Sequence, residues 1–101
     1  MEKLMYSFLK EIKDNDNRII KGETPIIPGF KDYEISPEAY GELILKLEDC
    51  GYIKASYARK KGIPSIVKSV EITDKGDKYL KENSKLGRVY RGLKELKEWI
   101  K

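Results

Sequence analysis

The stretch SPEAYGELILKLEDCGYI, residues 36–53, predicts a helix that ends at a glycine and continues into a strand. Ser36 can cap the free amide groups of a helix, and Pro37 has the backbone angle that suits the first helical position. Gly51 can adopt the left-handed conformation that commonly follows a last turn. We therefore expect a helix over residues 36–50, with four side chains at helical spacing facing the core: Tyr40, Leu43, Ile44 and Leu47.

The opposite face of this predicted helix is acidic. It presents Glu38, Gly41, Glu42, Leu45, Lys46 and Asp49. Three carboxylates against one ammonium group leave it with a net negative charge. Phosphates line both sides of the DNA major groove, so a carboxylate placed there is unfavourable unless it meets a donor such as cytosine. The pattern predicts that this helix packs the core and does not read bases.

Residues 52–72 follow with the pattern of a two-stranded hairpin. YIKASYA, residues 52–58, alternates in the manner of a half-buried strand and places three residues on one side: Ile53, Ala55 and Tyr57. SIVKSVEI, residues 65–72, is rich in β-branched residues and puts Val70 and Ile72 on one side.

The connection between these strands is the basic run RKKGIP, in which Gly62 supplies the positive φ that a hairpin tip commonly needs. Simple alternation places Lys68 on the core side with Val70, unless a β-bulge reverses its direction. The tip is therefore expected to display Arg59, Lys60 and Lys61 to solvent.

Helices are also predicted before and after this central region. The first should span residues 2–14, because the turn-favouring DNDN run at 14–17 follows an apolar stripe at helical spacing: Leu4, Met5, Phe8, Leu9 and Ile12. Two prolines make residues 15–35 irregular, and this segment is expected to cap the core through Ile26, Ile27, Phe30 and Ile35. Thr73 can cap a helix over 73–83 that turns Tyr79 and Leu80 inward, and a last helix is expected over 85–101.

A helix followed by a strand, a basic tip and a returning strand is the arrangement of a winged helix. The predicted fold class is thus α+β: a single winged-helix domain over 1–101, with a two- or three-stranded antiparallel wing and an extra C-terminal helix. A chain of 101 residues suits one compact domain.

Composition favours a globular protein of the cytoplasm. Apolar residues make up 40% and charged residues 38% of the chain, and no apolar run approaches the roughly 18–20 residues of a membrane span. The N-terminus has an acid at its second position and alternating charges, so it is not expected to act as a signal peptide. One cysteine excludes an internal disulfide framework, which suits a reducing compartment.

Catalytic chemistry has little support in the sequence. The chain has no histidine, which removes Ser-His and Cys-His nucleophile pairs and any metal site with histidine ligands. Its eight glycines are scattered and form no phosphate-binding loop. Cys50 is expected at a helix C-terminus, buried and inert, because the negative end of the helix disfavours a thiolate. We predict a non-enzymatic protein without cofactor, metal or small-molecule substrate.

Three stretches carry a resemblance to a known family: Cys50-Gly51-Tyr52-Ile53, ITDKGDKYLKEN at 72–83 and LKELKEWIK at 93–101. On these residues the chain resembles the YjcQ family, small winged-helix-like proteins of Gram-positive bacteria and their phages. The similarity covers most of residues 1–14 and 36–101, whereas 15–35 looks longer than the family pattern. It implies a fold and an origin in a bacterium or its phages, and it supplies no catalytic or ligand-binding residue.

Charge divides the chain unequally. Residues 1–53 hold 7 Lys and Arg against 11 Asp and Glu, a net charge of −4, whereas residues 54–101 hold 14 against 6, a net charge of +8. Such a division favours an anionic partner for the second half. The interpretation is a phage- or prophage-associated regulatory protein that contacts double-stranded DNA weakly and without sequence preference. The predicted contact residues are Arg59, Lys60, Lys61, Lys68, Arg88 and Arg91.

The alternative is a protein-interaction module that does not bind DNA. Apolar residues in the last helix step by three and four positions over slightly more than two heptads: Leu86, Val89, Leu93, Leu96 and Ile100. This seam could join two copies into a homodimer, or it could pack on its own domain and leave a monomer. In the same way, lysines at a hairpin tip can serve only to block edge pairing.

Overall fold

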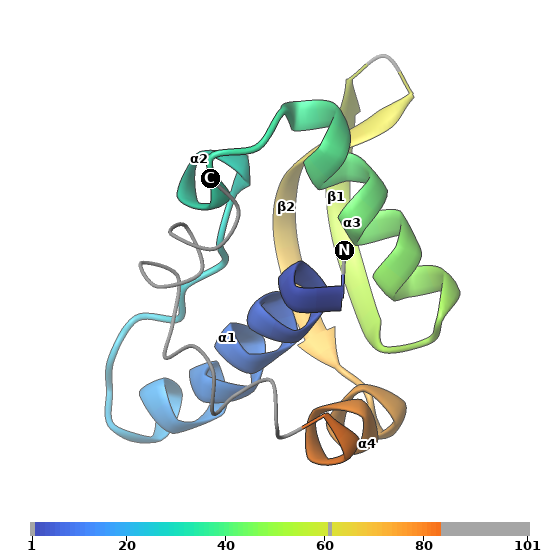
Figure 1. Cartoon of the computed structure of the whole chain (residues 1–101). Coiled ribbons are helices and arrows are strands. Elements are labelled where there is room, and N and C mark those ends of the chain that lie inside the picture. Colours follow the sequence, from blue (N-terminus) through green and yellow to red (C-terminus); the bar gives the residue numbers. More distant parts are fainter. Residues whose placement is uncertain (1, 61, 84–101) are drawn as a thin grey trace.

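The computed structural model describes residues 2–60 and 62–83. Its elements are α1 (Glu2–Ile20), α2 (Phe30–Tyr33), α3 (Pro37–Asp49), β1 (Ile53–Lys60), β2 (Ile63–Ile72) and α4 (Asp74–Glu82). In this part of the chain β1 and β2 form a two-stranded antiparallel sheet, and the helices gather around it (Figure 1). The described residues are thus of the α+β class. The helix predicted over 85–101 lies outside them.

Helix α1 is longer than the sequence predicts, and the expected break at the DNDN run is wrong. The cause is Asn15, whose buried amide donates from Nδ2 to the carbonyl of Ile26 at 2.8 Å and accepts from its N–H at 2.9 Å. Arg18 donates to Asn15 Oδ1 at 2.7 Å and pairs with Glu11 at 3.1 Å. Asn15 favours a turn when it is isolated, but its bonds to Ile26 and Arg18 satisfy it here, and the helix continues to Ile20.

The segment after α1 is irregular until the one-turn helix α2. The Asp32 carboxylate accepts from the Gly29 N–H at 2.7 Å, which starts this turn. Three of the four residues expected to cap the core pack against it: Ile27, Phe30 and Ile35. The prediction is wrong for Ile26, which is 48% exposed. Neighbouring side chains of an extended segment point to opposite sides, so the inward position of Ile27 leaves Ile26 outside.

Helix α3 confirms the prediction from the central stretch. Ser36 Oγ accepts from the Ala39 N–H at 3.1 Å, and Gly51 has φ +77° just after the helix. All four residues predicted to face inward are buried: Tyr40, Leu43, Ile44 and Leu47. Gly41, expected on the outer face, is buried instead. It lies three residues before Ile44 on the helix surface, so it borders the inward stripe.

The core lies between α1, α3 and the inner face of the sheet. Phe8 and Leu9 of α1 are fully buried there with Leu43 of α3. The rings of Phe8 and Tyr40 meet edge to face, with centroids 6.4 Å apart. The Tyr40 hydroxyl donates to the Pro28 carbonyl at 2.6 Å, so the irregular segment is tied to the same core.

Helix α4 begins where the sequence predicts. Thr73 Oγ1 accepts from the Gly76 N–H at 3.1 Å and donates to the Gly51 carbonyl at 2.6 Å. Leu80 is buried as expected, and the Tyr79 ring lies against that of Tyr52, with centroids 4.8 Å apart. The first turn of α4 is thereby fixed to the loop that joins α3 to β1.

Candidate nucleic-acid interface

The strand register of the hairpin has two irregularities, one between Ser56 and Tyr57 and one between Ala58 and Arg59. They change the directions in which its basic side chains point. Ser56 pairs with Ser69 and Tyr57 with Val67, so Lys68 is an extra residue on β2. Val67 packs against the core and Lys68 is exposed. The direction predicted for Lys68 by simple alternation is therefore wrong, and the bulge that could reverse it is present.

At the tip, the Arg59 guanidinium folds back on its own hairpin. It donates from Nη1 to the Gly62 carbonyl at 2.9 Å and from Nη2 to the Tyr57 hydroxyl at 3.2 Å. It also lies over the Tyr57 ring, 5.2 Å from the centroid. Gly62 has φ +83°, as the sequence predicts for this turn. Arg59 is exposed, yet three contacts hold its orientation.

The other two predicted tip residues, Lys60 and Lys61, come directly after Arg59 in the sequence. Lys60 is the last residue of β1 and pairs with Ile63, and Lys61 lies outside the described residues. Figure 1 shows the hairpin extending past the N-terminal end of α3, so its end projects from the body of the protein. Arg59 sits near that end, whereas Lys68 lies at the bulge, further toward the base.

A hydrogen-bonded link joins the hairpin to α3. The Tyr57 hydroxyl donates to Glu48 Oε1 at 2.6 Å while it accepts from Arg59. The bond to the Glu48 carboxylate raises the pKa of Tyr57 above its ordinary value, and the nearby guanidinium acts in the opposite direction. The sequence gives no signal for this link, because it depends on how α3 lies across the sheet.

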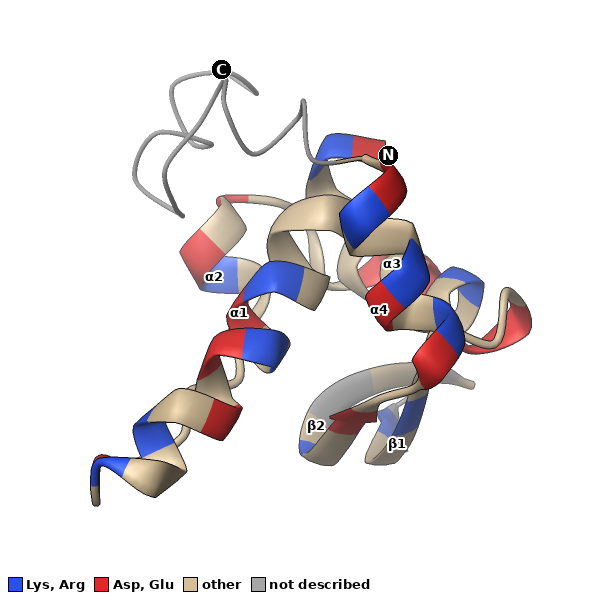
Figure 2. Cartoon of the chain, turned by 90° about the horizontal axis from the view of Figure 1, so that it is seen from below, with Lys and Arg blue, Asp and Glu red and all other residues tan. Residues whose placement is uncertain are grey.

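The exposed face of α3 carries the acids expected of it. Glu38, Glu42 and Asp49 are all exposed, and within the described ranges none of them forms an ion pair. Elsewhere the two signs of charge are mixed, as Figure 2 shows along α1 and α4. Lys13 of α1 pairs with Asp77 of α4 at 3.1 Å, for example. The helices thus offer no extended basic surface.

The hairpin is the most basic element of the described chain. Residues 53–72 contain five Lys and Arg and a single acid, Glu71. Glu71 lies opposite Lys54 in the strand register, and both residues are exposed. The remaining cations are Arg59, Lys60, Lys61 and Lys68. The other predicted contact residues, Arg88 and Arg91, lie outside the described residues, as does the seam of Leu86, Val89, Leu93, Leu96 and Ile100.

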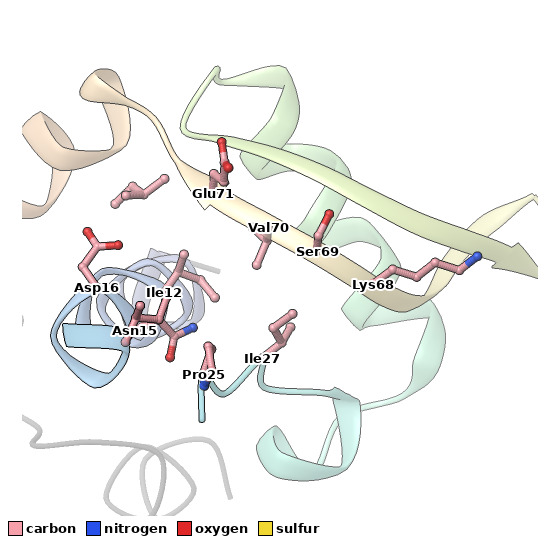
Figure 3. Close-up of a pocket in the computed structure, with 11 residues that line it drawn as sticks. Ile12, Asn15, Asp16, Pro25, Ile27, Lys68, Ser69, Val70 and Glu71 are labelled. Atoms are coloured by element: carbon pink, nitrogen blue, oxygen red, sulfur yellow. The ribbon is translucent and has the colours of Figure 1, made fainter. Parts of the chain in front are cut away.

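A second surface feature is a groove of about 530 Å³ beside β2 (Figure 3). One wall is the α1 face that carries Ile12, Asn15, Asp16 and Ile19, and the other is β2 from Lys68 to Ile72. Pro25 and Ile27 close one side. Sequence reasoning missed this groove, although the isoleucine pair at the end of α1 was a signal that the helix carries apolar surface away from the core.

The described residues give no further chemical centre. Cys50 is the C-cap of α3 and is half-buried rather than fully buried as predicted. Among residues 2–60 and 62–83, no three His, Cys, Asp or Glu side chains are grouped so that they could hold a metal ion. No helix in the same ranges combines the length and apolar character needed to cross a membrane.

These elements define a small α+β protein with a basic hairpin and an acidic helix face. The chain belongs to the YjcQ family, because the family model described as "YjcQ protein" matches residues 6–99. It is 33% identical over 102 residues to "Uncharacterized protein YjcQ" of Bacillus subtilis (strain 168), covering 99% of this chain and 97% of that protein. No solved structure matches the chain significantly.

The family assignment confirms the resemblance based on the three sequence stretches. The match also runs through residues 15–35, where the sequence pattern suggests a departure. The first part of that segment belongs to α1, which continues to Ile20, and the hydrogen bond between Asn15 and Ile26 joins a later part to this helix.

Proposed function

We propose that this protein is a non-enzymatic winged-helix module of the cytoplasm that contacts duplex nucleic acid weakly and without sequence preference. In this proposal β1 and β2 are the wing and α3 stands in the place of the recognition helix. The observation that carries the proposal is the contrast between the two elements. The projecting hairpin sequence holds five cations and one acid, whereas the exposed face of α3 holds three carboxylates that form no ion pair within residues 2–60 and 62–83.

The hairpin suits contact with phosphates rather than with base edges. Lysine is a flexible point charge, and phosphate contacts position a protein on DNA without conveying sequence. Arg59 is the one tip side chain that could read a base, but its guanidinium is engaged with Gly62 and Tyr57. Three or four such phosphate contacts give weak binding that depends strongly on salt.

Removing the tip charges tests the proposal. A variant with Arg59, Lys60 and Lys61 changed to alanine is expected to bind random duplex DNA on the order of tenfold more weakly at low salt, because three phosphate contacts are lost. The measurement is a fluorescence-anisotropy titration, with circular dichroism to verify the fold.

The matched control removes the same charge elsewhere. Lys10, Lys21 and Lys31 are exposed and lie in the first half of the chain, and their change to alanine should alter affinity by no more than about twofold. Equal affinity of the wild type and the tip variant would show that the hairpin is not the contact surface.

The second candidate function is a protein-interaction module, and the groove beside β2 favours it. Ile19 and Ile20, at the end of α1, are 60% and 82% exposed, and Ile26 is 48% exposed. Isolated exposed apolar residues are ordinary, but Ile19 also lines a groove with apolar walls. Under this alternative the basic tip keeps the hairpin edges from pairing and DNA is not bound.

A further inference from the structure

The last turn of α1 exposes two large apolar side chains. Ile19 is 60% exposed and Ile20 is 82% exposed. Figure 2 shows this end of the helix extending away from α3 and α4. The bonds from the buried Asn15 amide to the backbone of Ile26 support the helix one turn earlier, so both isoleucines stand on a fixed helix. Single exposed apolar residues are ordinary, but adjacent ones beside an apolar groove mark a contact surface.

The groove beside β2 begins at the same turn of α1. Ile12 and Ile19 belong to its α1 wall, Val70 and Ile72 belong to its β2 wall, and Ile27 lies at one side (Figure 3). Its volume is about 530 Å³. An exposed apolar side chain, Ile20, and an apolar surface that can receive such a side chain are therefore neighbours on the protein.

Neither a small polar ligand nor an added strand suits this groove. Ligand pockets hold their contents with a few convergent polar groups, but Asn15 in the α1 wall already uses its amide oxygen and nitrogen on Ile26. The bulge at Lys68 interrupts the edge of β2, which an added strand would need for regular pairing. Apolar side chains presented by a helix need no backbone partner, so they fit these walls better.

Charge points to a second copy of this chain as the occupant. The groove is lined by two carboxylates, Asp16 and Glu71, and by one cation, Lys68. Lys21 follows Ile20 directly and is exposed. The end of α1 thus combines an apolar side chain with a cation, and the groove combines apolar walls with an excess of acid. Every copy carries both halves of the contact, as a symmetric pairing of two copies requires.

We propose that two copies of the chain form a weak symmetric dimer in which the end of each α1 lies in the groove of the other copy. The two α1 helices run antiparallel, with Ile19 of both copies close to the twofold axis. Ile20 of each copy packs on Val70 of the other, and Lys21 lies beside Asp16. The contact uses neither the tip of the hairpin nor residues 84–101, so it stands independently of the proposed contact with nucleic acid.

Sedimentation equilibrium of the full chain without nucleic acid tests the dimer. The mass of the wild type should rise from that of one chain toward that of two as the concentration approaches about 1 mM, where weak contacts are populated. Ile20→Glu should raise the dimer Kd on the order of tenfold or more, because it removes the apolar contact and brings an acid to an acidic groove. Circular dichroism verifies the fold of this variant.

The matched control adds the same charge at a distant position. Ser36→Asp retains a good helix cap at the start of α3, which Figure 1 places far from the end of α1, and it should leave the Kd within about twofold of the wild type. A wild type that stays monomeric at about 1 mM, or a dimer that Ile20→Glu does not weaken more than Ser36→Asp does, would overturn the proposal.

A charge exchange tests the antiparallel arrangement. Lys21→Asp should raise the dimer Kd roughly fivefold, because each dimer loses two ion pairs and gains repulsion from Asp16. Adding Asp16→Lys in the same chain restores opposite charges across the contact and keeps the net charge of the wild type, so most of the lost affinity should return. A double variant no tighter than Lys21→Asp alone would contradict the arrangement and, with it, the proposal.

An isotope-filtered NOE experiment identifies what lies in the groove. Isotope-labelled and unlabelled chains are mixed, so that only contacts between different copies are observed. The methyl groups of Ile20 in one copy should give NOEs to those of Val70 in the other. Groove methyls that show NOEs only to residues of their own chain, or intermolecular NOEs confined to residues outside α1 and β2, would assign the groove or the dimer to another contact and overturn the proposal.

Discussion

Changing Phe8 to alanine is expected to lower the free energy of unfolding by about 3–5 kcal/mol. Phe8 is fully buried on α1 and its ring meets Tyr40 of α3 edge to face, so truncation removes apolar contact and leaves a cavity between the two helices. A domain of this size is stabilised by only about 5–15 kcal/mol, so the loss is a large share of the total.

Urea denaturation followed by circular dichroism measures this effect. Asn17→Ala on the same helix is the control, because Asn17 is exposed and the change should stay within about 0.5 kcal/mol. If Phe8→Ala shifted the midpoint no further than Asn17→Ala, α1 would not pack on α3 as described.

Gly76→Ala is expected to lower the free energy of unfolding by about 3 kcal/mol, at the upper end of typical overpacking effects. A Cβ at Gly76 would clash with the Tyr52 carbonyl oxygen and would lie 2.7 Å from Ile72 Cγ1. The backbone contact cannot yield without moving the first turn of α4 away from the loop before β1. The clash outweighs the roughly 1 kcal/mol that alanine normally contributes to a helix relative to glycine.

The same chemical change at Gly29 should act in the opposite direction. Gly29 has φ −106°, and a Cβ there would have only Asp32 Oδ2 nearby, at 3.8 Å. Gly29→Ala is therefore expected to be neutral or to stabilise by up to about 1 kcal/mol, through a less flexible unfolded chain. Thermal unfolding of the two variants side by side checks the pair. Equal stabilities would contradict the close packing of α4 on Tyr52.

Local signals in the sequence predict the centre of the fold well. The cap at Ser36, the stripe from Tyr40 to Leu47 and the stop at Gly51 each depend on neighbouring residues, and together they define α3. The hairpin follows from alternation and from Gly62 for the same reason. Of the three stretches that suggest the YjcQ family, one joins α3 to β1, one covers α4 and one is at the C-terminus, and the family match confirms the resemblance.

Tertiary contacts decide what the sequence does not predict. The DNDN run favours a turn locally, and only the distant backbone of Ile26 makes Asn15 compatible with a longer helix. Lys68 turns outward because β2 has one residue more than the facing part of β1. Period-two counting cannot place a bulge, since it assumes that every residue has a partner.

The candidate site divides in the same way. The acidic face of α3 and the basic tip are visible in the sequence because helical and strand periodicities place them. The sequence does not reveal the contacts of Arg59 with Tyr57 and Gly62, or the hydrogen bond from Tyr57 to Glu48. These contacts depend on how separate parts of the chain are placed in space, which no local sequence pattern determines. Arg59 thus becomes a residue that shapes the tip as well as a cation on it.

The central claim is that the hairpin contacts phosphates while the acidic face of α3 reads no bases. Its most direct test is the salt dependence of binding to two duplexes of equal length and unrelated sequence. The account predicts that log Kobs falls with log salt with a slope of about −3 for both duplexes, and that their affinities agree within about twofold. An absence of binding at low salt, or a hundredfold preference for one sequence, would contradict it.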